Sequence, residues 1–133
     1  MAVNVLAVAL GGGIGAACRY LLSSLVTRLA GGLAFAGSLP LGTLAVNVLG
    51  CLVIGFLAPM LASVVPARPR LTLFLVTGVL GGFTTMSSFS NETLTLYEGG
   101  QQALAVGYAA GTLVLCMAAV AVGAALARIV ARG

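Results

Sequence analysis

The chain has no histidine, aspartate, lysine or tryptophan, and only two glutamates among its 133 residues. These absences remove most of the groups from which enzymes assemble a metal site, a nucleophile with its base, or an acid and base pair. The two carboxylates, Glu92 and Glu98, fall toward the end of one apolar segment and do not supply such a pair. We therefore do not expect an enzyme.

Charge and cysteine are scarce as well. Six arginines are the only basic side chains, and they are scattered, which argues against a nucleic-acid partner. The cysteines are Cys18, Cys51 and Cys116, in separate apolar segments. Their spacing fits neither a metal motif nor a disulfide framework, so we interpret them as small packing residues.

Apolar residues dominate the composition. They make up 61% of the chain, and the mean hydropathy is +1.21. A soluble or disordered chain could not keep so many apolar residues away from water, whereas a membrane-spanning helix requires about 20 apolar residues. The sequence predicts an all-α membrane protein, a single domain of four transmembrane helices at about 3–26, 40–61, 71–97 and 102–130.

The third segment differs from a plain spanning helix. Residues 78–92 read GVLGGFTTMSSFSNE, in which helix-weakening glycines are followed by a dense run of hydroxyl groups. Backbone that leaves the helix at membrane depth survives only where it is buried in protein or lines a wet cavity. We predict that this helix is broken near 78–85 and faces a polar pathway.

A broken helix places two kinds of backbone group in the membrane. Carbonyls at the end of the first half-helix, near Gly78 to Gly81, suit a small hard cation such as Na⁺. Amides at the start of the second half-helix, near Thr84 and Thr85, suit an anion. Neutral donors beside them can replace the water shell of a small anion without trapping it.

The first two helices contribute three polar candidates. Asn47 is strongly polar, and Thr43 lies one turn before it on the same face. Asn47 either forms an interhelical hydrogen bond that fixes packing or lines the pathway as a donor. Arg19 either extends its head group to the membrane interface or lines a wet vestibule. In the same first helix, small residues such as Gly11 and Gly15 recur at helical spacing and permit close approach of another backbone.

The last two helices add further candidates. Met86 and Phe89 share a face of the third segment, and they either pack in the core or stand along the pathway. Tyr108, Thr112 and Cys116 recur every four residues and form a weakly polar stripe on the fourth helix. Their hydroxyls either bond to nearby backbone or face the pathway. No internal repeat is visible, so two copies of the chain would have to supply the two halves of a transport site.

Three motifs make the chain resemble the Fluc fluoride channels, also called the CrcB family. They are GGIGAACRY at 12–20, PLGTLAVNVLG at 40–50 and GGFTTMSSFSNE at 81–92. The third is similar to a family pattern close to GGFTTFSTFSxE. With four hydrophobic segments of matching length, the resemblance covers essentially the whole chain.

The resemblance implies an antiparallel, dual-topology homodimer in the inner (plasma) membrane, with two pores that passively export cytoplasmic fluoride. It implies a central structural Na⁺ held by the backbone carbonyls of Gly81 and Thr84 from each subunit, and no organic cofactor. Arg19 is expected in an aqueous vestibule. The residues expected along the fluoride pore are Thr43, Asn47, Met86, Ser87, Ser88, Phe89, Glu92, Tyr108 and Thr112.

Two positions depart from the family pattern. Met86 stands where the family has the first of two phenylalanines, and a thioether offers no ring edge. Cys116 stands on the fourth helix where a hydroxyl is expected.

Two other classes of protein remain as alternatives from the sequence. A small dimeric proton-coupled multidrug exporter needs an acidic residue deep in a helix, and the first helix has none. Glu92 is the only candidate, and it is expected near a membrane interface. A structural membrane protein would use the Gly/Thr/Ser stretch only for packing. Mutation of Asn47 and Phe89 separates that class from a channel, because a channel would lose flux while remaining dimeric.

Overall fold

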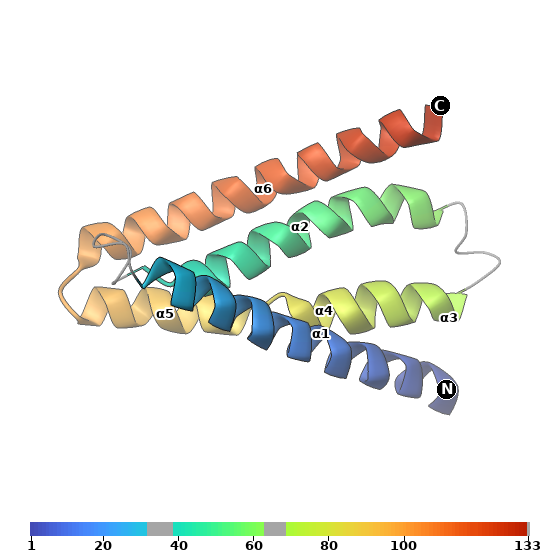
Figure 1. Cartoon of the computed structure of the whole chain (residues 1–133), viewed down its shortest axis with the longest axis horizontal. Coiled ribbons are helices and arrows are strands. Elements are labelled where there is room, and N and C mark those ends of the chain that lie inside the picture. Colours follow the sequence, from blue (N-terminus) through green and yellow to red (C-terminus); the bar gives the residue numbers. More distant parts are fainter. Residues whose placement is uncertain (32–38, 63–68, 133) are drawn as a thin grey trace.

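The computed structural model describes residues 1–31, 39–62 and 69–132, and the secondary structure in these ranges is entirely helical. Two long helices, α1 (Ala2–Ala30) and α2 (Leu41–Ala62), precede a composite third segment (Figure 1). That segment comprises α3 (Pro69–Thr72), the π-helical η1 (Leu73–Leu80), α4 (Gly81–Phe83) and α5 (Met86–Glu98). The last helix is α6 (Gln102–Arg132). Four helical stretches are long and apolar enough to cross a membrane, so the predicted all-α class with four spans is confirmed.

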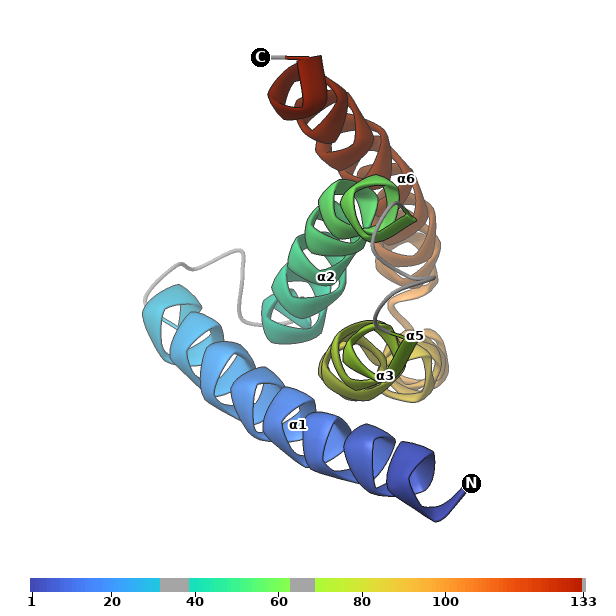
Figure 2. The ribbon, with the colours of Figure 1, turned by 90° about the vertical axis from the view of Figure 1, so that its right-hand side faces the viewer.

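The two halves of the third segment pack against different helices. Its first half, η1 and α4, packs against α1, whereas α5 packs against α6, and α2 packs along α6. Figure 2 shows α1 on one side of the third segment and the α2–α6 pair on the other. Both termini lie at the same end of the bundle (Figure 1), as an even number of spans requires.

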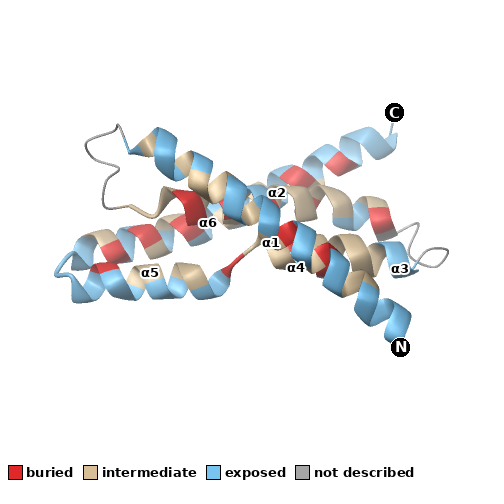
Figure 3. Ribbon diagram, turned by 60° about the horizontal axis from the view of Figure 1, so that its bottom comes forward, coloured by how far each residue is buried: buried red, intermediate tan, exposed pale blue. Residues whose placement is uncertain are grey.

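Glycine allows α1 to contact the third segment backbone to backbone. A Cβ atom on Gly15 would lie 2.8 Å from the backbone nitrogen of Phe83, and one on Gly78 would lie 2.9 Å from the Cα of Gly11. Neither position has room for a side chain, so the predicted close approach through Gly11 and Gly15 is confirmed. Figure 3 shows exposed residues over much of the outer faces of α1 and α6, which are the faces available to lipid or to another chain.

The third segment leaves helical geometry only at Thr84 and Thr85. Thr84 is extended (φ −78°, ψ 155°) after α4, and Thr85 is extended (φ −147°, ψ 106°) before α5. Gly78, Gly81 and Gly82, which the sequence marks as weak points of this helix, all lie in helical backbone. At Gly78 and Gly82 the missing side chain makes room for α1 instead.

Candidate functional site

Asn47 of α2 holds the open backbone at the break. Its side-chain nitrogen donates to the carbonyl oxygen of Thr85 (3.1 Å), and its Oδ1 accepts from the backbone N–H of the same residue (2.9 Å). The Asn47 amide thus bonds both the N–H and the C=O of Thr85, which in a continuous helix would bond to other backbone groups of the same helix. Of the two hypotheses for Asn47, the interhelical bond is present. The second amide hydrogen of Asn47 has no acceptor within residues 1–31, 39–62 and 69–132, and it can serve another acceptor.

Thr85 caps the half-helix that follows the break. Its side-chain oxygen accepts from the backbone N–H of Ser88 (3.2 Å) and donates to the Ser88 hydroxyl (3.0 Å), and it lies 3.3 Å from the hydroxyl of Ser87. Only 6% of Thr85 is exposed. The sequence predicts only that the amides near Thr84 and Thr85 suit an anion, whereas the N–H of Thr85 donates to Asn47 Oδ1. The capping side chain of Thr85 is not among the predicted site residues. A threonine just after the glycine-rich stretch and three residues before a serine is a helix N-cap signal that could have identified it.

The carbonyls of Gly81 and Thr84, predicted to hold Na⁺, lie where helical hydrogen bonding is interrupted. In a continuous helix the N–H of Thr85 would bind the first carbonyl and the N–H of Ser88 the second. Both amides donate elsewhere, to Asn47 Oδ1 and to the Thr85 hydroxyl. Two backbone carbonyls are thereby released from the usual donors, which is the chemistry that a hard cation requires.

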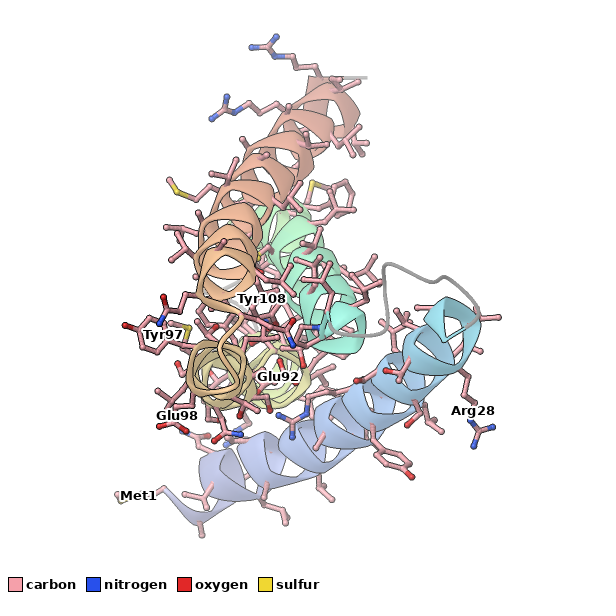
Figure 4. All side chains as sticks on the ribbon, turned by 90° about the vertical axis from the view of Figure 1, so that its left-hand side faces the viewer. Met1, Arg28, Glu92, Tyr97, Glu98 and Tyr108 are labelled. Carbon is pink, nitrogen blue, oxygen red and sulfur yellow. The ribbon has the colours of Figure 1, made fainter. Side chains whose placement is uncertain are left out.

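Glu92 of α5 lies between α2 and α6. Its Oε1 accepts from the hydroxyl of Thr43 (2.7 Å), and its Oε2 accepts from the hydroxyl of Tyr108 (3.0 Å). The Tyr108 ring also contacts Phe89, with 5.4 Å between the ring centroids. Figure 4 shows Glu92 and Tyr108 inside the bundle, whereas Glu98 lies at its periphery. The two glutamates therefore have different surroundings, which their nearness in sequence conceals.

A cavity of about 550 Å³ opens between α1, α2 and α5, and we call it the arginine cavity. Arg19 and Arg28 stand on its wall with Thr43, Thr85, Ser88 and Glu92. Arg19 and the carboxylate thus face a common space, although α1 and α5 are far apart in the sequence. A cation on the wall of a polar cavity attracts anions toward it.

A second cavity of about 470 Å³ lies on the other side of the break, and we call it the Asn47 cavity. Its wall includes Asn47, Gly81, Thr84, Met86, Phe89 and Thr112. Thr112 is only 5% exposed, and its hydroxyl has no hydrogen-bond partner within the described parts of the chain. Met86 is 71% exposed, so this cavity is open on one side.

The structure therefore divides the predicted pore residues between two cavities that share Thr85. Ser87 is exposed and stands on neither wall, although it lies beside Thr85. Tyr108 is buried behind both walls, where it contacts Glu92 and Phe89.

Comparison with known proteins places the chain in a family. Residues 6–124 match the family model described as CrcB-like protein, Camphor Resistance (CrcB). A fluoride-specific ion channel FluC of Ruminiclostridium cellulolyticum is 42% identical over 129 residues, which cover 97% of this chain and 95% of that protein. Another FluC, of Paracoccus denitrificans, is 48% identical over 123 residues, covering 92% of this chain and 93% of the relative. A FluC of Agrobacterium fabrum is 46% identical over 126 residues, or 95% of this chain and 97% of the relative. The chain belongs to the CrcB/FluC family.

Proposed function

We propose that this protein is a fluoride-selective channel that lets cytoplasmic fluoride leave the cell passively. The relatives named above are fluoride-specific ion channels, and they match nearly the full length of this chain. The observation that carries the proposal is the break at Thr84–Thr85, where buried polar groups from several helices meet between two cavities at membrane depth.

The arginine cavity would admit the anion. Arg19 and Arg28 raise the local concentration of anions, and the hydroxyl of Ser88 offers a first neutral donor. Glu92 accepts hydrogen bonds from Thr43 and Tyr108, which fixes the direction of both hydroxyl dipoles.

The Asn47 cavity would replace the water shell of the ion. Asn47, with its second amide hydrogen, and Phe89, with its electropositive ring edge, belong to its wall. Thr112 lies on the same wall, and its buried, unpartnered hydroxyl would turn toward the ion. These groups are neutral, so they stabilise fluoride without holding it as firmly as a buried arginine would. Ser87, at the start of α5, would extend the polar surface past the cap.

We further propose that the working unit is an antiparallel, dual-topology homodimer with a structural Na⁺ at its centre. The carbonyls of Gly81 and Thr84 would hold the ion, once from each subunit, and its role would be to join the two broken helices. Gly81 and Met86 are exposed at the wall of the Asn47 cavity. A second chain on this open side would close the cavity, which supports the dimer.

The test is passive fluoride efflux from liposomes that contain the purified protein, measured with a fluoride electrode beside a parallel chloride assay. We expect rapid fluoride release with negligible chloride release. Phe89→Ala should slow fluoride release, and the matched control Leu94→Ala should not, because Leu94 is exposed and lines neither the arginine cavity nor the Asn47 cavity. No fluoride release from folded dimers would refute the channel and favour a packing protein, whereas equal release of both anions would refute selectivity.

A further inference from the structure

Two cysteines from different helices meet on the wall of the Asn47 cavity. Cys51 of α2 and Cys116 of α6 both line it. Both are free, partly buried thiols. Their spacing in the sequence predicts only separate packing residues, because nothing in it indicates that the helices bring them together.

The packing of α2 on α6 fixes this pairing. One turn beyond the cysteines, a Cβ atom on Gly55 would lie 2.9 Å from the Cα of Val120. Further along, a Cβ atom on Gly123 would lie 2.8 Å from the backbone nitrogen of Phe56. Helices in backbone contact at these points cannot slide past one another without a clash. The register of the two helices therefore keeps Cys51 and Cys116 on the same cavity wall.

We propose that Cys51 and Cys116 form a binding site for a divalent thiophilic cation, with Hg²⁺ as its best probe. Thiolates are the preferred ligands of soft metal ions. Binding releases one proton from each thiol and forms two metal–sulfur bonds, with no change in oxidation state. Met86 places a thioether on the wall of the same cavity.

Charge balance suits this site to its depth in the membrane. An uncompensated charge at the centre of a bilayer is costly. Two thiolates and one divalent cation sum to zero, so the complex adds no net charge to an apolar cavity. The third cysteine, Cys18, is exposed on α1 and belongs to neither cavity wall, so it would bind such an ion through one sulfur only.

An ion bound here occupies the cavity that we assign to dehydrated fluoride. It stands one helical turn from both Asn47 and Thr112, which lie on the same wall. The bound metal therefore blocks fluoride flux. This second effect rests on the proposed function, whereas metal binding itself does not.

The experiment uses the full-length protein with Cys18→Ser, which leaves only the cysteine pair. Bound Hg²⁺ is counted by elemental analysis after desalting, and proton release is measured during the titration. We expect one metal ion and two protons per chain. Cys116→Ser in the same background should weaken binding by about 100-fold or more, because the second ligand then no longer acts at high effective concentration. Cys116→Ala provides the same comparison if the serine variant does not fold.

Two metal ions per chain, or equal affinity with and without Cys116, would overturn the site. Fluoride efflux from liposomes then separates the two proposals. Block by Hg²⁺ in the Cys18→Ser protein that is relieved by a dithiol, and that requires about 100-fold more Hg²⁺ in the Cys116→Ser variant, supports both. One bound ion per chain in a protein that never releases fluoride would leave the metal site standing and refute the channel, and one bound ion without block would refute the position that we assign to the pore.

Discussion

Replacing Asn47 by alanine tests whether this side chain holds the broken helix. The change removes both hydrogen bonds to Thr85 and leaves the N–H and C=O of a residue that is only 6% exposed without their partner. Side-chain hydrogen bonds in membrane proteins contribute about 0.6 kcal/mol on average and about 1.7 kcal/mol at most. Two such bonds predict that the free energy of unfolding falls by about 1 to 3 kcal/mol.

The Asn47→Ala change should also lower fluoride flux, because it frees the backbone at the break. With the break no longer fixed, the released carbonyls of Gly81 and Thr84 and the cap at Thr85 lose their positions, so fluoride flux should fall together with stability. Asn47→Asp keeps the acceptor for the N–H of Thr85 but places a carboxylate oxygen against its carbonyl, and it should lower flux as well. The control is Asn4→Ala, because Asn4 is exposed near the start of α1.

Reversible unfolding in mild detergent, followed by helical circular dichroism, measures the first effect, and liposome efflux measures the second. If the Asn47→Ala protein had the same free energy of unfolding as the wild type, the claim that Asn47 stabilises the broken helix through Thr85 would be refuted. If that protein also lost flux, Asn47 would act on the ion directly and not by holding the break.

Three further perturbations follow from the contacts. Gly15→Ala should lower the free energy of unfolding by about 1 to 3 kcal/mol, because its Cβ would meet the backbone of the third segment. The control Gly13→Ala has nothing within 4 Å of its Cβ and should be neutral or slightly stabilising. Equal free energies of unfolding for the two variants would contradict the packing of Gly15 on the third segment. Tyr108→Phe removes one hydrogen bond to Glu92 and keeps the ring, so it should lower the free energy of unfolding by about 1 to 2 kcal/mol. An unchanged unfolding midpoint would show that this bond does not stabilise the protein. Exchange of Na⁺ for a large organic cation should lower both the dimer fraction in cross-linking and the fluoride efflux, and an unchanged dimer would argue against a structural sodium ion.

The sequence predicts the helices well because their signals are local. Apolar runs of sufficient length determine four spans, and the small residues of α1 mark the face that meets another helix. The position of the break is harder to predict, since glycine weakens an isolated helix but also permits close packing. At Gly78 and Gly82 packing prevails, and the chain leaves the helix two residues later, where Asn47 can satisfy the opened backbone.

The pairings across helices could not be predicted from spacing alone. Nothing local indicates that Thr43 and Tyr108 share one carboxylate, or that Arg19 faces the same cavity as Glu92. The cysteine pair has the same origin, because Cys51 and Cys116 come together only through the register of α2 on α6. These contacts depend on the angle and offset between helices, which many distant backbone contacts determine jointly.

The two packing modes of the third segment explain why the break belongs where it is. Before Thr84 the segment contacts α1 through glycine and backbone. After Thr85 it contacts α2 and α6 through Glu92 and Phe89, which need hydroxyl and aromatic partners. A continuous helix would retain the N–H of Thr85 and Ser88 for its own carbonyls, and Asn47 would then have no backbone to bind. The break is thus the junction that lets one segment join an apolar, closely packed half to a polar half, and the carbonyls released there are the groups that a cation at a dimer axis would use.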